Sequence, residues 1–269
     1  MFDLVKKIIL LVLLSHFSFS QIIQIGSDID GEATNDQSGQ SVSLSSDGSI
    51  VAIGAPFNDA NGNNNSGHVR VYEWDSGNSS WIQKGNDIDG EATDDQSGRS
   101  VSLSSDGTIV AIGAHRHNAN GSNFGHVRVY KWNGSSWVQR GNDIDGEAAE
   151  DFSGYSVSLS SDGTIVAIGA IKNDGNGSNA GHVRIYEWNG SSWVQRGDDI
   201  DGEAAEDQSG RSVSLSSDGS IVAVGARQND GNGDKSGHVR VYEWNGLAWV
   251  QKGSDIDGEA AYDYSGRTV

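Results

Sequence analysis

The chain has 269 residues, one proline and no cysteine, and its formal net charge is −19 at pH 7. Such an acidic balance argues against nucleic acid and anionic membranes as partners, and it favours solubility. Without cysteine there are no disulfides and no thiolate chemistry, so stability must come from packing or from bound metal.

Residues 1–20 have the layout of a secretory signal peptide. Two lysines precede the apolar run Ile8–Leu14, and small residues follow at Ser18 and Ser20. The apolar run is too short to span a bilayer, which argues against a membrane anchor. We therefore predict cleavage near Ser20 and a protein that is secreted or held at the cell surface, with no segment inserted in a membrane.

The remaining sequence, residues 21–269, is built from one repeat that contains an Asp-Ile-Asp-Gly motif. The units run over 26–84, 85–140, 141–196 and 197–252, with a partial unit at 253–269. Each full unit reads as four strands, and no segment has a helical period. Four strands per unit of this length favour a β-propeller blade. The predicted fold class is therefore all-β, a propeller of four-stranded blades with about four repeats present.

The last unit stops at Val269, inside its predicted first strand. A strand without its hairpin partner leaves an open sheet edge, which folded proteins avoid. We therefore expect an incomplete ring that belongs to a longer protein. The alternative is a small ring closed by four blades, the lower limit for propellers.

The first two strands of each unit are predicted to form a hairpin, which in the first unit is Ser41–Ala55. The Asp47-Gly48 pair at its centre is typical of a type I′ turn. This register pairs the bulky residues of one face, Leu44 with Val51 and Val42 with Ile53. The opposite face is mostly serine, alanine and glycine, so we expect it to admit the larger side chains of a neighbouring sheet.

A third strand is predicted at His68–Trp74 and a fourth at Trp81–Lys84, and both recur in every full unit. The histidine of the third strand returns at His68, His126, His182 and His238. A catalytic group is normally needed once, so this recurrence indicates packing or hydrogen bonding between blades. The paired tryptophans are expected to stack on one another, with stacking on a sugar as the alternative.

The pattern Gly39-x-Ser-Val, then Val51–Pro56, then Gly67–Tyr72 resembles the FG-GAP repeats of integrin α-subunits, and most closely their bacterial secreted variety. The resemblance covers residues 26–269. It implies a β-propeller with an extracellular binding or adhesion role.

The sequence departs from the family at its calcium loop. The acidic run that integrin-type repeats carry in the first hairpin is reduced here to Ser45-Ser46-Asp47-Gly48. One carboxylate in a tight turn cannot supply the six or more oxygens that Ca²⁺ requires. The family's calcium site is therefore not transferred to this turn.

Two other acidic places are candidates for calcium, the only cofactor that the sequence suggests. The candidate ligands are Asp143, Asp145 and Glu147 in a connection between units, and Asp174, Asn176, Asp230 and Asn232 in Asn/Gly-rich loops. The loops are similar to Asp-x-Asn calcium loops. The alternatives are acids that cap backbone amides and ordinary flexible turns. No serine nucleophile elbow or phosphate-binding loop is present, and no catalytic residue is assigned.

The loop after each Gly-Ala pair differs between units, whereas the surrounding framework is uniform. The candidate ligand-binding residues in these loops are Phe57, His115, Arg116, His117, Lys172 and Arg227. This contrast predicts a non-enzymatic scaffold for binding or adhesion, with an extracellular protein or glycan as partner. The alternatives are an accessory propeller of a larger secreted hydrolase and a structural spacer without ligand.

Overall fold

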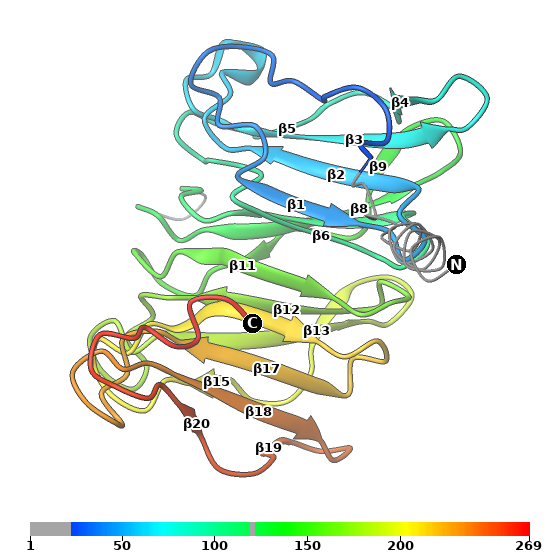
Figure 1. Cartoon of the computed structure of the whole chain (residues 1–269). Coiled ribbons are helices and arrows are strands. Elements are labelled where there is room, and N and C mark those ends of the chain that lie inside the picture. The colour runs from blue at the N-terminus through cyan, green and yellow to red at the C-terminus, as the bar shows by residue number, and fades with distance from the viewer. Residues whose placement is uncertain (1–22, 119–121) are drawn as a thin grey trace, which may run out of the picture.

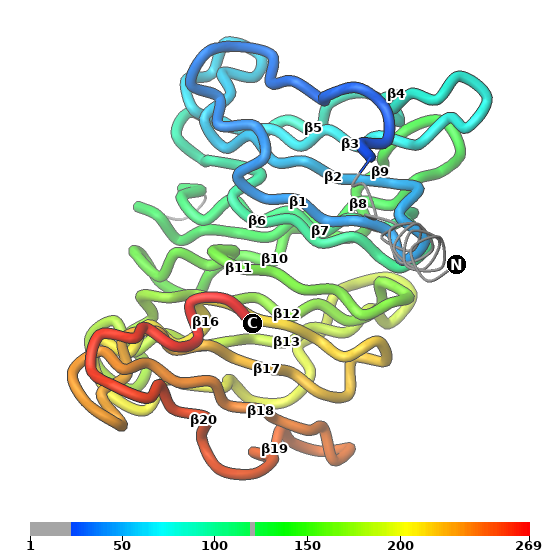
Figure 2. Tube along the Cα trace, in the orientation of Figure 1, coloured from blue at the N-terminus to red at the C-terminus, as the bar shows by residue number. Residues whose placement is uncertain are grey.

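The computed structural model describes residues 23–118 and 122–269, and this part of the chain is all-β (Figures 1 and 2). The predicted signal peptide lies outside the described residues. One short 3₁₀ turn, Ala60–Gly62, interrupts the strands. No helix in the described ranges is long and apolar enough to cross a membrane.

Twenty strands form four antiparallel sheets of five strands each. The first sheet holds β1 (Ser41–Leu44), β2 (Ile50–Ala55), β3 (His68–Asp75), β4 (Ser80–Gln83) and β5 (Ile88–Asp89). The second holds β6 (Ser100–Leu103), β7 (Ile109–Ala114), β8 (His126–Trp132), β9 (Trp137–Gln139) and β10 (Ile144–Asp145). The third holds β11 (Ser153–Leu159), β12 (Ile165–Ala170), β13 (His182–Trp188), β14 (Trp193–Gln195) and β15 (Ile200–Asp201). The fourth holds β16 (Ser209–Leu215), β17 (Ile221–Ala226), β18 (His238–Trp244), β19 (Trp249–Gln251) and β20 (Ile256–Asp257).

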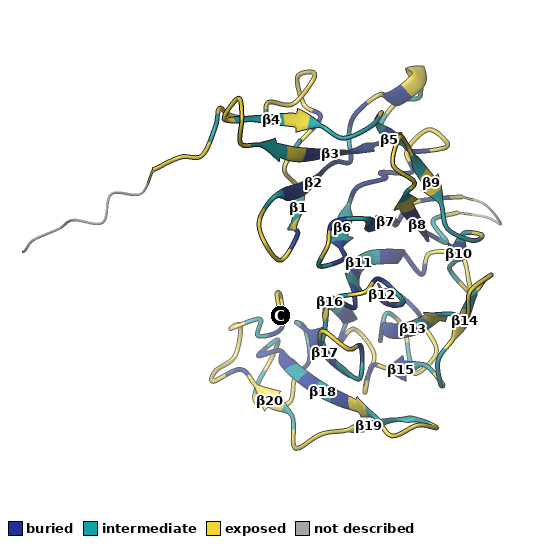
Figure 3. Ribbon diagram, turned by 90° about the vertical axis from the view of Figure 1, so that its right-hand side faces the viewer, coloured by how far each residue is buried: buried dark blue, intermediate teal, exposed yellow. Residues whose placement is uncertain are grey.

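The four sheets, hereafter blades, lie side by side in an arc (Figure 3). The strands β1, β6, β11 and β16 line the inner side of the arc and contact one another in sequence, and β4, β9, β14 and β19 lie outside. Buried apolar clusters join each blade to the next, and within the described residues none joins the first blade to the fourth. The prediction of a propeller-like all-β fold is confirmed: each blade has the four predicted strands and one more, and the described residues form no closed ring.

The predicted hairpin register is confirmed, but the predicted turn type is wrong. Val42 pairs with Ile53 and Leu44 with Val51. A type I′ turn requires positive φ at both central residues, and of the Asp47-Gly48 pair only the glycine has it, at φ 71°. A longer turn forms because the Asp47 carboxylate accepts hydrogen bonds from three groups, namely the Ser45 hydroxyl and the amide and hydroxyl of Ser49. These hydrogen bonds lower the pKa of Asp47 to about 2, and the bond from the Ser49 amide has the largest effect.

Each junction between blades packs a small face against a bulky one, as predicted. At the first junction the bulky face of the second blade, which includes Val101 and Leu103, is buried against Ala52 and Val71 of the first. Polar groups on the small face complete the contact, since the Ser43 hydroxyl accepts a 2.9 Å hydrogen bond from the Leu103 amide. The small face therefore both admits apolar side chains and satisfies backbone groups of its neighbour.

Two further contacts tie each unit to the blade before it. The short strand β5 comes from the second unit but pairs with β3, so that Val69 faces Ile88; this fifth strand was not predicted. At the outer edge the Trp137 indole donates a 2.7 Å hydrogen bond to the Lys84 carbonyl. The tryptophans of a blade also pack on one another, with ring centroids 5.3–5.4 Å apart.

Candidate functional site

The start of the first strand, the end of the second and the start of the third meet at one end of every blade. We call this the loop end; it lies on the left in Figure 1. It carries the variable loops, the recurring histidines and the acidic connections between units. All candidate site residues from the sequence except the hairpin turn belong to this end.

The variable loops are less exposed than their composition indicates. His115 is buried against the rings of Phe152 and Tyr155, and Lys172 lies with its ammonium 4.5 Å from the centre of the Phe152 ring. Arg116 is exposed. The remaining candidates, Phe57 and Arg227, are half-buried.

His117 occupies a framework position rather than a free loop position. In the other blades this position is asparagine, and each donates to an aspartate: Asn58 to Asp36, Asn173 to Asp151 and Asn229 to Asp207, at 2.8–3.0 Å. In the second blade His117 Nδ1 lies 3.0 Å from Asp95 Oδ2. This hydrogen bond raises the pKa of His117. Each of these aspartates also accepts a hydrogen bond from the backbone amide three residues before it. The aspartates therefore act as caps of backbone amides.

The loop end also carries Arg99, Arg211 and Arg267, which the sequence did not mark as candidates, beside the candidate Arg227. Arg99 donates a 2.6 Å hydrogen bond to the Tyr155 hydroxyl. The guanidinium carbons of Arg99 and Arg211 lie 4.4 and 4.5 Å from the centre of the Tyr155 ring. The positive charges of Arg227 and Arg267 repel that of Arg211. We call Arg99 and Arg211, which lie over Tyr155, together with Arg227 and Arg267 the arginine cluster.

Burial first, and repulsion from Arg227, Arg99 and Arg267 second, lower the pKa of Arg211 to about 10. Burial also lowers the pKa of Arg99. Within the described residues, no carboxylate lies within 4.0 Å of any arginine of the cluster. The cluster is thus a positive patch without protein counter-ions in an acidic chain.

A β-bulge presents this set of side chains. In β11 the pairing with β12 shifts between Ser153 and Ser156, which leaves Gly154 and Tyr155 outside the regular ladder, and β16 has the same bulge at Gly210 and Arg211. Bulges re-aim a side chain away from the sheet. A signal was present in the sequence: the residue after a constant glycine varies between units, and reads Gln40, Arg99, Tyr155, Arg211 and Arg267.

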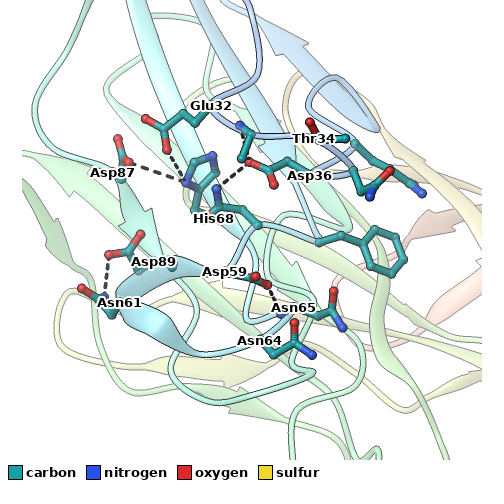
Figure 4. Close-up of a pocket in the computed structure, with 16 residues that line it drawn as sticks. Glu32, Thr34, Asp36, Asp59, Asn61, Asn64, Asn65, His68, Asp87 and Asp89 are labelled. Carbon is teal, nitrogen blue, oxygen red and sulfur yellow. Dashed lines mark hydrogen bonds and ion pairs between the residues drawn. The ribbon is translucent and has the colours of Figure 1, made fainter.

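An acidic pocket of about 820 Å³ opens at the loop end of the first blade. Figure 4 shows His68 pointing between Glu32 and Asp87 in this pocket. The His68 Nδ1 atom lies 3.8 Å from Glu32 Oε2 and 3.5 Å from Asp87 Oδ2. Across the pocket Asn61 donates a 2.7 Å hydrogen bond to Asp89.

The calcium candidates do not converge on one point. Asp143 and Asp145 group with His126, whereas Glu147 faces His182 of the next blade. Asp174 accepts a 2.7 Å hydrogen bond from the Asn179 amide. The other three loop residues are engaged in the same way: Asn176 donates to Gly202, Asp230 accepts from Lys235 and Asn232 donates to Gly258. The two aspartates thus hold their own loops in shape, whereas the two asparagines tie the loops to the following connection, and calcium at the loops stays a prediction.

Blades that repeat one set of strands, junctions and loop-end residues define a propeller-type repeat protein. The family model for the FG-GAP repeat matches residues 28–72, 144–186 and 200–242. The chain therefore contains FG-GAP repeats, as the resemblance predicted. No curated protein matches the sequence.

Solved structures with a similar fold are more distant. The periplasmic gluconolactonase PpgL of Pseudomonas aeruginosa is 14% identical, with a TM-score of 0.52 over 81% of this chain and 57% of that one. The hydrazine synthase of Kuenenia stuttgartiensis is 13% identical, with a TM-score of 0.49 over 88% of this chain and 53% of that one. The chain thus spans little more than half the length of either structure. The likeness to PpgL shows the propeller-like fold alone.

Proposed function

We propose that this protein is a non-enzymatic binding and adhesion scaffold that captures an anionic extracellular ligand, such as a sulfated or uronic-acid-rich glycan, at its arginine cluster. The observation that carries the proposal is the cluster itself. Arg99 and Arg211 lie over one tyrosine, the charges of Arg227 and Arg267 act on Arg211, and none of the four has a carboxylate within 4.0 Å among the described residues, in a chain of net charge −19. Like charges repel, so a neighbouring anion stabilises such a group.

The chemistry of the cluster fits sulfate and carboxylate groups. A guanidinium offers a planar fork of donors that matches these anions in two parallel hydrogen bonds. Arg99 and Arg211 both stack on Tyr155, which fixes their planes before a ligand arrives. A site that is ordered in advance loses less conformational entropy on binding.

An extracellular location accompanies this proposal. The signal peptide predicted at residues 1–20 supports a secreted or surface-held protein. The variable loops support binding rather than catalysis, since Arg116, Lys172 and Arg227 differ between blades while the framework stays the same.

The test is binding to an array of sulfated, uronic-acid and neutral glycans, with the double variant Arg99→Ala/Arg211→Ala. The matched control is Lys131→Ala/Lys252→Ala, which changes the net charge equally at residues on β8 and after β19. We expect the wild type and the control to bind anionic glycans, and the arginine variant to lose most of this affinity. Binding of the wild type should weaken as salt rises, because the attraction is electrostatic.

Two outcomes would contradict the proposal. If the two double variants bind equally, the arginine cluster is not the binding site. Because PpgL is a gluconolactonase, the wild type should also be assayed for δ-lactone hydrolysis. If the wild type hydrolyses the lactone and Arg99→Ala/Arg211→Ala does not, the protein is an enzyme and not a scaffold.

A further inference from the structure

Every blade repeats one arrangement at its loop end that the proposed function does not use. A histidine that begins the third strand faces a glutamate from the connection before its blade and an aspartate from the connection after it. The groups are Glu32, His68 and Asp87 in the first blade, Glu147, His182 and Asp199 in the third, and Glu203, His238 and Asp255 in the fourth. In the second blade His126 lies with Asp143 and Asp145 on one side and with Glu91 and His117 on the other.

The histidine nitrogens lack adequate partners in the protein. All four rings are almost fully buried. Both nitrogens of His126 and of His238 are buried without a hydrogen-bond partner within the described residues. The Nδ1 atom of His238 points at the carboxylates, 3.8 Å from Glu203 Oε2 and 3.7 Å from Asp255 Oδ2. A buried polar atom left unpaired in this way lowers stability, so a ligand at this position would restore what is lost.

The spacing suits a metal ion better than a hydrogen bond. Across the blades the Nδ1-to-carboxylate distances are 3.4–3.9 Å, with one further contact of 4.0 Å to Asp257. Hydrogen bonds of this type are usually about 2.7–3.2 Å long. Ligand atoms that share a tetrahedral ion at bond lengths near 2.0–2.1 Å lie roughly 3.3 Å apart. Small shifts of exposed carboxylates would close the remaining difference.

We propose that these sites bind a divalent transition-metal ion of the Zn²⁺ type, held by the histidine Nδ1 and the two carboxylates. An imidazole with carboxylates suits Zn²⁺ and its neighbours, whereas Ca²⁺ takes oxygen ligands alone. The acids are partly exposed, so a water molecule can complete the coordination.

An arginine orients the glutamate of each site. Arg70, Arg184 and Arg240 place Nη1 within 3.4–3.6 Å of one oxygen of Glu32, Glu147 and Glu203, and the other oxygen of that glutamate faces the histidine. Two carboxylates carry two negative charges against one from the arginine. The site therefore keeps a net negative charge for a divalent cation.

The second blade offers the fullest set of donors. Its His117 ring stacks on His126, with centroids 3.9 Å apart. Asp95 occupies His117 Nδ1, which leaves Nε2 as the nitrogen for a metal. A carboxylate that fixes the tautomer of a metal-binding histidine is a common arrangement around zinc. We therefore expect the tightest binding in the second blade.

The test uses metal-free protein without a polyhistidine tag, titrated with Zn²⁺ by calorimetry and with Co²⁺ by visible absorption. Glu147→Gln should remove one site, and it avoids disturbing a buried ring. The matched control is Glu187→Gln, whose carboxylate is exposed and pairs with Arg196 outside the proposed metal sites. We expect up to four ions per chain in the wild type and the control, and one fewer in Glu147→Gln.

A second variant tests the ranking of the sites. His117→Asn installs the residue that the other blades carry at this position, so the fold should be kept. We expect the number of ions to stay the same while the tightest site weakens roughly 10- to 100-fold. The proposal is overturned if the wild type takes up no Zn²⁺ at millimolar concentration, or if Glu147→Gln and Glu187→Gln bind equally.

Discussion

His115 shows how strongly one side chain can depend on residues from the next blade. Its ring is 6% exposed and packs on Phe152 and Tyr155. Burial first, and the charges of Arg99, Arg116 and Arg211 second, lower the pKa of His115 from 6.5 to about 3. The folded protein therefore keeps this imidazole neutral at a pH where the unfolded chain protonates it.

This shift predicts a loss of stability in acid. Between pH 6.5 and about 3 the unfolded chain binds a proton at His115 that the folded chain does not, so unfolding is favoured as the pH falls. His115→Phe has no group to titrate and keeps an aromatic ring in place. Denaturant unfolding at about pH 7 and about pH 4 should show the variant gaining roughly 3 kcal/mol on the wild type over this range.

The same comparison contains its control. Other acids and histidines titrate in both proteins, so their contributions cancel in the difference between variant and wild type. If the difference in free energy of unfolding between the two proteins does not change with pH, His115 is protonated in the folded protein. That result would contradict a buried, neutral imidazole.

At this scale the sequence predicted which residues vary but not where they lie. His115 and His117 were selected as loop residues that contact a ligand, and both are buried. Their burial depends on Phe152, Tyr155 and Asp95, which no local pattern connects with them. Of the arginine cluster only Arg227 was selected, and Arg99, Arg211 and Arg267 were missed for the same reason, because no local pattern connects residues of different units.

The junction between blades depends on a glycine in the second strand. A Cβ added at Gly113 of β7 would collide with the Gly154 carbonyl of the next blade and with the Ser100 hydroxyl. The equivalent glycines Gly54, Gly169 and Gly225 meet the same obstacle. Backbone of one blade thus lies directly against backbone of the next, with no room for a methyl group.

Gly113→Ala should therefore destabilise the protein by about 1–3 kcal/mol, the usual range for overpacking. Denaturant midpoints measure the loss. Gly77→Ala is the matched control, since Gly77 lies in an exposed turn where the nearest group to an added Cβ is the Asp75 side chain at 3.2 Å and no backbone is in the way. Equal midpoints for the two variants would show that the blades can separate slightly without penalty.

Regular strands were predictable because period and turn residues agree within a few positions. The hairpin register follows from alternating residues around Asp47-Gly48, and the structure has it. The strand β5 has two residues and no period, and its pairing with β3 depends on a distant segment. The turn type was wrong because side-chain hydrogen bonds from Ser45 and Ser49 decide it.

Among the described residues the first and the fourth blade each pack against one other blade. Leu44 on the outer face of the first blade is 57% exposed, whereas its equivalent Leu103 in the second is 7% exposed. At the other end Ile256 is 58% exposed against 4% for Ile200. Stability in stacked repeats is the sum of units and nearest-neighbour contacts, so the middle blades have the larger share.

Native-state hydrogen exchange should reveal this gradient. We expect the amides of β7 and β12, in the middle blades, to exchange more slowly than those of β2 and β17 in the end blades, because each end blade opens by breaking one junction instead of two. The strands have the same length, which makes them matched controls for one another. Uniform protection would mean that the four blades unfold as one unit.

The likeness of the junctions has a consequence for how such a protein changes over generations. Ser43, Ser102 and Ser158 make the same contact with the next blade, so any unit already fits behind any other. Duplication or loss of a whole unit therefore creates only interfaces of a kind that the protein already contains. Recombination between the near-identical stretches can therefore exchange complete loops as cassettes, and a new combination of ligand-contacting residues arises in a single genetic step.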